Sequence, residues 1–234
     1  MKNTVHIIEN HDFGSADAGE THLRHQGYNV HIHKVWKDAP MPKLDGNTAG
    51  VMVLGGPQMV SEHEKWPHMA AEFRFVETVI QQQVPLIGIC LGAQVIAHVL
   101  GASVRYAPDG QQLMGYYKTK PVDPKSHLFG QEMYVLNGNA QGFDVPKTAK
   151  LLAYSDETTH PNQAFTYGDT VIALQFHPEV TRDILNHWQT DYAYLLGRPG
   201  TQTIAQQDAG FVQYDGAIKA WYLDLLGKLI QPLA

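Results

Sequence analysis

Cysteine is nearly absent from this chain of 234 residues, which contains a single one, Cys90. One cysteine excludes an internal disulfide and fits a reducing compartment. No apolar run in the sequence approaches the ~20 residues of a membrane-spanning helix, and the first ten residues do not resemble a signal peptide. From these absences we expect a cytoplasmic protein that makes no use of a membrane.

Positive charge is also scarce. The chain has 17 lysine and arginine residues against 23 aspartate and glutamate residues, a formal net charge of −6, and no basic run, so we expect no nucleic-acid partner. It contains neither a P-loop nor a G-x-G-x-x-G motif, and we expect no cofactor. His31 and His33 share a face of a predicted strand, but no cysteine or carboxylate stands close by in the sequence, so we expect no metal ion there.

The most informative stretch is residues 84–101, VPLIGICLGAQVIAHVLG. Residues 84–89 form a short apolar run typical of a buried strand, and from Leu91 the apolar residues recur with helical spacing. Cys90 lies at the junction, inside the sequence GICLG of residues 88–92. A G-x-nucleophile-x-G pattern between a strand and a helix predicts a nucleophile elbow, a tight turn that presents the side chain above the carboxyl edge of a sheet.

The position of Cys90 bears on its chemistry. Backbone N–H groups and the helix dipole at such a junction favour the thiolate, the form that attacks a carbonyl carbon. A buried core thiol is the usual state of an isolated cysteine. The two glycines at the elbow spacing favour a nucleophile instead.

A second group of polar residues follows the predicted strand at residues 171–175, in the sequence FHPE of residues 176–179. In an extended segment, residues i and i+2 point the same way, so His177 and Glu179 lie side by side. A carboxylate beside an imidazole holds its tautomer and favours its protonated form, as a Cys–His pair requires. Cys90, His177 and Glu179 are therefore predicted to form a catalytic triad.

Strand and helix patterns alternate in the first half of the chain, which predicts a parallel sheet covered on both faces. The predicted strands are residues 5–8, 28–35, 50–54 and 84–89, and the predicted helices are residues 18–26, 67–83 and 91–100. Ligands of such sheets bind at the carboxyl ends of the strands. Residues 55–57, GGP, follow the third strand at that edge, which makes this tight turn a candidate oxyanion loop.

The second half of the chain has a different pattern, with short strands separated by turn residues up to about residue 175. Two amphipathic helices follow, at residues 181–195 and 212–229, with a loop predicted at residues 200–210 between them. We interpret residues 1–234 as one domain with a C-terminal helical extension at about 181–234, whose helices serve in packing.

Three motifs together resemble the class I glutamine amidotransferase family: GGP at 55–57, GICLGAQ at 88–94 and QFHPE at 175–179. The resemblance spans nearly the whole chain, and PNQAF at 161–165 resembles stand-alone members related to the amidotransferase domain of GMP synthase. We therefore expect an α/β, flavodoxin-like three-layer sandwich with a central, mostly parallel sheet, helices on both faces and a β-rich second half.

The resemblance implies hydrolysis of the glutamine side-chain amide to glutamate and ammonia through a γ-glutamyl thioester. By the same resemblance, Cys90 is the nucleophile, His177 acts first as base and then as acid, and Glu179 orients His177. The N–H groups of Gly56 and Leu91 are implied to form the oxyanion hole.

The family resemblance also implies a site for the amino acid end of the substrate, formed by the side chain of Gln94 and the backbone around Gly115 and Tyr116. One segment departs from the family pattern. Where many relatives have a His-Gly-Asp segment before a Phe-x-x-Pro turn, this chain reads NAQGFDVP at residues 139–146. The departure affects the identity of the substrate more than the type of reaction.

Three hypotheses follow. The first is a glutamine-hydrolysing amidotransferase that acts on L-glutamine and passes ammonia to a synthetase partner chain, because these residues contain no nucleotide-binding synthetase domain of their own. The second keeps the same triad but takes γ-glutamyl peptides or conjugates as substrates. The third is a non-enzymatic regulator that retains the fold, against which the intact triad argues.

Overall fold

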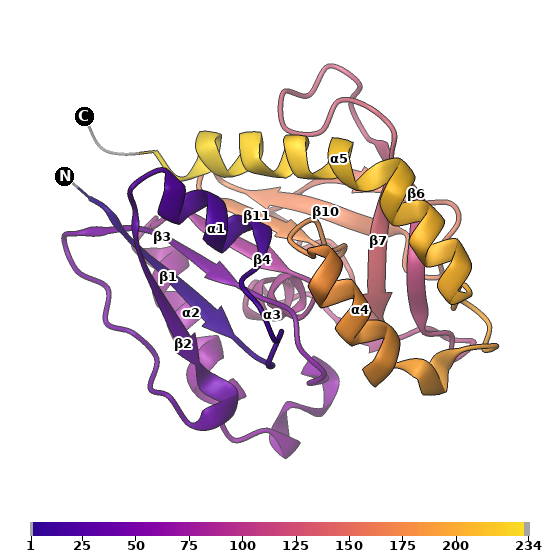
Figure 1. Ribbon diagram of the computed structural model, residues 1–234. Coiled ribbons are helices and arrows are strands. Elements are labelled where there is room, and N and C mark those ends of the chain that lie inside the picture. Colours follow the sequence, from indigo (N-terminus) through magenta and orange to yellow (C-terminus); the bar gives the residue numbers. More distant parts are fainter. Residues whose placement is uncertain (1, 232–234) are drawn as a thin grey trace.

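The computed structural model describes residues 2–231, and a nine-stranded sheet runs through the molecule (Figure 1). The strand order is β2-β1-β3-β4-β11-β10-β9-β6-β7, and a second sheet pairs β5 with β8. The expected α/β fold with helices on both faces of a central sheet is confirmed.

Five neighbouring strands of the large sheet are parallel: β1 (Thr4–Glu9), β2 (Asn29–Lys34), β3 (Thr48–Val53), β4 (Leu86–Ile89) and β11 (Val171–Leu174). Every residue of β3, β4 and β11 is buried, because helices cover both faces of a parallel sheet. This accounts for their almost unbroken apolar sequences. The order 2-1-3-4-11 matches the flavodoxin-like order, with β11 in the fifth place.

The other strands of the large sheet pair in antiparallel fashion and form the β-rich second half. They are β10 (Asn162–Tyr167), β9 (Lys150–Tyr154), β6 (Leu113–Pro121) and β7 (Met133–Asn139). The small sheet consists of β5 (Val104–Tyr106) and β8 (Gln141–Phe143). The sequence pattern does not predict β8, a strand of three residues whose pairing with β5 is long-range.

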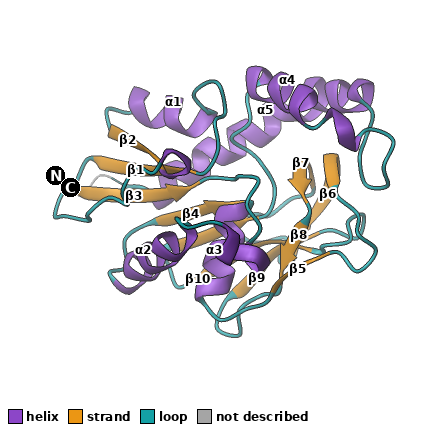
Figure 2. Cartoon of the chain, turned by 90° about the horizontal axis from the view of Figure 1, so that it is seen from below, coloured by secondary structure: helices purple, strands orange, loops and turns teal. Residues whose placement is uncertain are grey.

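Helices cover the two faces of the sheet (Figure 2). One face is covered by α1 (Ala18–His25), α4 (Arg182–Asp191) and α5 (Ile204–Leu229), and the other by α2 (Met69–Gln81) and α3 (Leu91–Val99). Short 3-10 helices occupy Val35–Lys37, Val60–Lys65 and Ala193–Leu195. Each face has its own apolar core, centred on Tyr222 and Leu185 on the first and on Val76 and Ile96 on the second.

The predicted loop at residues 200–210 is wrong, because α5 already begins at Ile204. Thr203 caps this helix, and Gln206 completes a capping box by accepting from the N–H of Thr203. Gly210, a weak helix former that favoured a loop, lies inside the helix. A Cβ atom at Gly210 would lie 2.4 Å from the ring of Tyr116, so the glycine permits close packing of α5 on β6.

No helix within residues 2–231 is both long enough and apolar enough to cross a membrane. The longest helix, α5, has a buried face toward the sheet and an opposite face with charged and polar side chains. Its length therefore reflects packing along the sheet, which it follows from the antiparallel half to α1 (Figure 1).

Candidate active site

Cys90 occupies the sharp turn between β4 and α3, as the elbow pattern predicted. Its backbone has φ +51° and ψ −104°, a conformation rare for a residue other than glycine. The Cys90 N–H donates to the carbonyl oxygen of Leu174 at 2.7 Å, which ties the turn to β11. A conformation of this kind costs on the order of 1–3 kcal/mol and persists only where the surrounding structure enforces it.

The two glycines of the elbow are required by close contacts. A Cβ atom at Gly92 would lie 2.0 Å from the carbonyl oxygen of Val53, and one at Gly88 would lie 2.6 Å from the backbone of Gly92. The first turn of α3 therefore rests directly against β3 and β4. This close approach holds Cys90 at the carboxyl edge of the sheet.

His177 and Glu179 form a buried pair immediately after β11. The distance from His177 Nδ1 to Glu179 Oε1 is 2.7 Å, and the two residues are only 4% and 0% exposed. An Nδ1–H that donates to the carboxylate leaves Nε2 for proton transfer, and Nε2 has no hydrogen-bond partner within residues 2–231. Burial lowers the pKa of His177, but the negative charges of Glu179 and Cys90 outweigh it and hold the pKa above 6.5.

The side chains of Cys90 and His177 meet at Gly55. A Cβ atom at Gly55 would lie 2.9 Å from the His177 ring and 3.6 Å from the Cβ of Cys90. Gln175 donates from its side-chain amide to the Cys90 sulfur at 3.7 Å. A donor directed at sulfur stabilises the thiolate, so this glutamine complements the charge that a reactive cysteine needs. Its position in QFHPE could have suggested this contact.

The two predicted oxyanion donors lie beside the cysteine. The side chain of Leu91 lies within 3.2 Å of a Cβ atom placed on Gly56, so the two residues are neighbours. Within residues 2–231, neither the N–H of Gly56 nor that of Leu91 donates to a backbone carbonyl outside regular elements. Leu91 is the first residue of α3, where N–H groups lack a partner in the helix.

A cavity opens above Cys90 and His177. Residues from five parts of the fold line it: the loops after β1 and β3, the elbow and α3, the strands β6 to β8, the segment after β11, and α4 with the segment after it. They are His11, Phe13, Gly56, Pro57, Gln58, Met59, Cys90, Gln94, Gln112, Leu113, Met114, Gly138, Asn139, Ala140, Gln141, His177, Trp188, Tyr192, Tyr194 and Leu195.

The predicted residues for the amino acid end of the substrate divide into two groups. Gln94 lines the cavity, where its side chain donates to the carbonyl oxygen of Gln141 at 2.8 Å. Gly115 and Tyr116 are not brought to the cavity. The N–H and the carbonyl oxygen of Tyr116 are both bonded to the side chain of Gln202, which also lies against Gly115. The cavity instead reaches Gln112 to Met114 on the same strand.

The segment that departs from the family pattern lies in the cavity wall. Asn139 and Gln141 are both buried there, and the side chain of Asn139 donates to the carbonyl oxygen of Gln141 at 3.0 Å. The side chain of Gln141 is bonded in turn to Ser61. The Asn139 side-chain oxygen has no hydrogen-bond partner within residues 2–231. The segment thus presents two amide side chains to the cavity.

Trp188 is a residue that the sequence analysis assigned to packing alone. Its ring meets the His177 ring edge to face, with centroids 4.7 Å apart and an interplanar angle of 84°. It therefore restricts the orientation of the His177 ring. Only its helical spacing was visible in the sequence, and that spacing does not distinguish this role from ordinary core packing.

Comparison with known proteins gives consistent results. A family model described as glutamine amidotransferase class-I matches residues 11–187. A glutamine amidotransferase-like protein of Salmonella typhimurium, YfeJ, is 26% identical over 217 residues, which cover 88% of this chain and 89% of that protein. A glutamine-hydrolysing GMP synthase of Cytophaga hutchinsonii is 29% identical over 180 residues, which cover 74% of this chain but only 33% of that protein.

Solved structures share the fold along the whole chain. A glutamine amidotransferase from Thermotoga maritima superposes with a TM-score of 0.87 at 25% identity, covering 99% of this chain and 100% of its own. A glutamine amidotransferase from Methylobacillus flagellatus has the same fold, with a TM-score of 0.87 at 19% identity, covering 100% and 98% of the two chains. The family match over residues 11–187 establishes that this chain belongs to the class I glutamine amidotransferase family.

Proposed function

We propose that this protein hydrolyses the side-chain amide of L-glutamine to glutamate and ammonia, through a γ-glutamyl thioester on Cys90. The observation that carries the proposal is the strained Cys90 turn beside the buried His177–Glu179 pair in one cavity. Family membership alone supports amidotransferase chemistry in general. The arrangement of these three side chains supports the specific reaction.

In the proposed reaction, His177 takes the Cys90 proton, and the sulfur attacks the side-chain carbonyl carbon of glutamine. The carbonyl oxygen becomes an oxyanion that accepts from the N–H groups of Gly56 and Leu91. The C–N bond then breaks as His177 returns its proton to the nitrogen, which leaves as ammonia. Water attacks the thioester with His177 as base, the C–S bond breaks, and glutamate and the free thiol remain.

Glu179 and Trp188 act as positioning residues in this proposal. The carboxylate of Glu179 fixes the His177 tautomer and stabilises the imidazolium, while the Trp188 ring restricts the orientation of the imidazole. Both contacts exist without substrate. The enzyme therefore needs little rearrangement of His177 when glutamine binds.

The amino acid end of glutamine binds, in this proposal, between Gln94 and the segment of residues 139–141. The unpartnered side-chain oxygen of Asn139 accepts a hydrogen bond from the substrate's α-ammonium group. Residues 112–114 line the cavity in place of Gly115 and Tyr116, and the backbone of Tyr116 is bonded to Gln202 while that of Met114 is bonded to Gly200 and Gln202. In this proposal, binding thus uses the side-chain amides of Gln94 and Asn139.

Ammonia released at Cys90 passes, in this proposal, to a synthetase partner chain. GMP synthase relatives are described as glutamine-hydrolysing, and this chain matches 33% of the Cytophaga protein. The rest of such relatives has no counterpart in this chain. We therefore expect a separate partner chain to carry the acceptor site.

A second candidate function is hydrolysis of γ-glutamyl peptides or conjugates by the same residues. Tyr192, Tyr194 and Leu195 line the mouth of the cavity, and Tyr194 is 60% exposed. An aromatic rim of this kind offers a leaving group larger than ammonia a surface to stack on. The substituted segment at residues 139–141 is consistent with a substrate other than free glutamine.

The test is release of glutamate by the purified protein from L-glutamine and, in parallel, from a γ-glutamyl dipeptide. The Cys90→Ala variant reports background hydrolysis, and His25→Gln, on the exposed side of α1, serves as a matched control for His177→Gln. We expect activity on L-glutamine that Cys90→Ala and His177→Gln both lose and His25→Gln keeps. Turnover of the dipeptide alone would support the second candidate, and equal rates for wild type and Cys90→Ala would refute both.

A further inference from the structure

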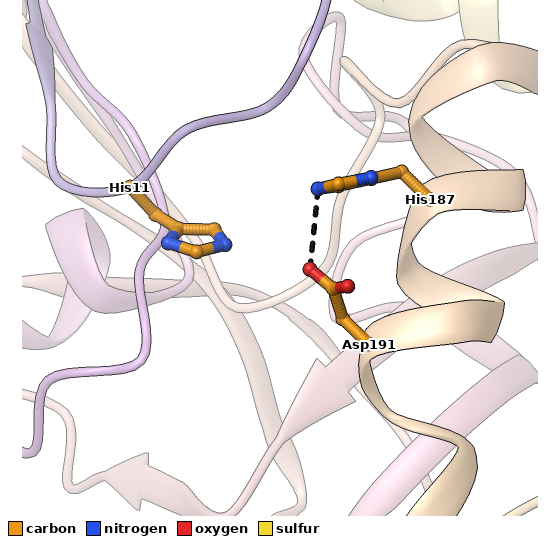
Figure 3. A group of neighbouring side chains, drawn as sticks. All are labelled: His11, His187 and Asp191. Atoms are coloured by element: carbon orange, nitrogen blue, oxygen red, sulfur yellow. Dashed lines mark ion pairs between the residues drawn. The ribbon is translucent and has the colours of Figure 1, made fainter.

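Three side chains with metal-ligating atoms converge where the loop after β1 faces α4 (Figure 3). His11 lies in the loop after β1, and His187 and Asp191 lie one turn apart on α4. One donor atom from each residue lies within 4.8 Å of those of the other two. His187 Nε2 and Asp191 Oδ2 already form an ion pair at 3.1 Å.

We propose that His11, His187 and Asp191 form a binding site for a divalent late transition-metal ion, with Zn²⁺ the best match. Two imidazole nitrogens and one carboxylate oxygen form a donor set suited to Zn²⁺ and unlike the all-oxygen sets of Mg²⁺ and Ca²⁺. Three protein ligands leave the fourth position of a tetrahedral ion open to water.

The geometry requires only small movements. Tetrahedral ligands bonded at 2.0–2.2 Å lie roughly 3.3–3.6 Å from one another. His187 and Asp191 are spaced i, i+4, so their side chains share one face of α4 and need little adjustment. Closing the remaining gap takes a shift of about 1 Å by the His11 ring, which is only half-buried.

The surroundings favour a cation. Asp191 is the last residue of α4, where the carbonyl groups at the end of the helix concentrate negative charge. Asp12 follows His11 directly and adds a second carboxylate nearby. An ordinary i, i+4 ion pair on α4 needs only His187 and Asp191. Here His11, from the loop after β1, adds a third donor beside the pair.

The site would connect two parts of the cavity wall. His11 lines the cavity, and so does Trp188, the residue next to His187 whose ring packs on His177. A bound ion would therefore tie the loop after β1 to α4 close to the proposed general base. The inference itself rests on the donor geometry and stands apart from the identity of the substrate.

The test is titration of Zn²⁺ by calorimetry into the Cys90→Ala protein, because a free thiol binds Zn²⁺ by itself. We expect one ion per chain, and an affinity reduced roughly 100-fold or more in His11→Gln and in His187→Gln, since even the loss of a residue supporting a ligand costs 10–100-fold. Co²⁺ in place of Zn²⁺ should give the visible absorption of a tetrahedral ion that either variant loses.

The control is His33→Gln, which removes a member of the other histidine cluster, where His33 Nε2 lies 3.1 Å from His6 Nδ1. This variant should bind Zn²⁺ as Cys90→Ala does. Saturating Zn²⁺ at about 100 times Kd should also raise Tm by about 5–10 °C in the control but not in His187→Gln. Absence of stoichiometric binding, or binding unchanged in His11→Gln and His187→Gln, would overturn the proposal.

Discussion

The cavity has two walls that differ in origin. The first, here called the motif wall, consists of Gly56, Cys90 and His177 and is formed at the carboxyl ends of β3, β4 and β11. The second, the outer wall, consists of Asn139, Gln141, Tyr192, Tyr194 and Leu195, from the end of β7, from β8 and from the segment after α4.

The motif wall is fixed by contacts of the backbone and the outer wall by contacts of side chains. At the elbow that holds Cys90 in the motif wall, close contacts at Gly88 and Gly92 leave no room for a Cβ atom. In the outer wall, Gln141 is held through its amide to Ser61, and Tyr194 is mostly exposed. From this difference we propose that the motif wall sets the reaction type and the outer wall the substrate. Substitutions in one wall or the other can separate these two roles.

Apart from removal of Cys90 or His177, the largest effect on activity is expected from Glu179→Gln, which leaves the shape of the motif wall intact. An amide in place of the carboxylate no longer fixes the required His177 tautomer or stabilises the imidazolium, so kcat should fall by about 10³–10⁴. Steady-state kinetics over a range of pH measures this. Since the carboxylate helps to hold the His177 pKa high, the pH profile should also shift, and an unchanged kcat would contradict the role of Glu179.

The backbone contacts of the motif wall can be broken by Gly92→Ala. The added Cβ atom would lie 2.0 Å from the Val53 carbonyl oxygen, and we expect a loss of about 3–5 kcal/mol in the free energy of unfolding. Gly227→Ala on α5 is the matched control, because nothing lies within 4 Å of its Cβ position. It should be neutral or stabilising by up to about 1 kcal/mol, since alanine is the better helix former. Equal unfolding midpoints in denaturant would contradict the close packing at the elbow.

Glu72 lies behind the motif wall, where its carboxylate accepts from Asn10 and is fully buried. Burial raises its pKa from 4.5 to about 7, with partial opposition from the Asn10 hydrogen bond. A folded-state pKa above the unfolded value means that the native state holds the proton more tightly. The contribution of Glu72 to stability is therefore complete below pH 4.5 and is lost as the pH rises to about 7.

The corresponding measurement is chemical unfolding of wild type and Glu72→Gln at pH 4.5 and at pH 8. Between these pH values the stability of wild type relative to the variant should decrease by roughly 2–4 kcal/mol, because each pKa unit corresponds to 1.36 kcal/mol. A difference that does not depend on pH would show that Glu72 is ionised in the native state.

The smallest effect is expected in the outer wall, from Tyr194→Ala. This exposed ring touches only the entrance of the cavity, so its loss should raise KM for a γ-glutamyl conjugate with an aromatic leaving group by up to about tenfold. The kcat for both substrates and the KM for L-glutamine should remain unchanged. A fall in kcat on L-glutamine would mean that the two walls do not divide the roles in this way.

The same contrast explains which parts of the molecule could be predicted from the sequence. Cys90, His177 and Glu179 are encoded by local motifs, because a strand end and its glycines place each side chain within a few residues. The parallel order of β1, β3 and β4 also follows from alternating apolar strands and helices. The meeting of Cys90 with His177 further requires the parallel pairing of β4 with β11.

The remaining parts depend on contacts between distant segments. Gly115 and Tyr116 lie outside the cavity lining because Gln202, from the segment before α5, binds their strand. The sequence pattern does not predict the start of α5, because Gly210 favours a loop. This glycine lies in the helix instead, where it permits close contact with Tyr116, a residue distant in the sequence. The contact of Trp188 with His177 likewise arises only when α4 folds back onto the segment after β11.

The most direct test of the central claim is reaction of the protein with a diazoketone analogue of glutamine, followed by intact-mass spectrometry. A nucleophilic Cys90 should form one covalent adduct per chain, and peptide mapping should place it on Cys90. Labelling should be absent in Cys90→Ala, slowed in His177→Gln and prevented by excess L-glutamine. A folded wild-type protein that remains unlabelled, or that L-glutamine does not protect, would contradict the account of Cys90 as a nucleophile in a glutamine-binding cavity.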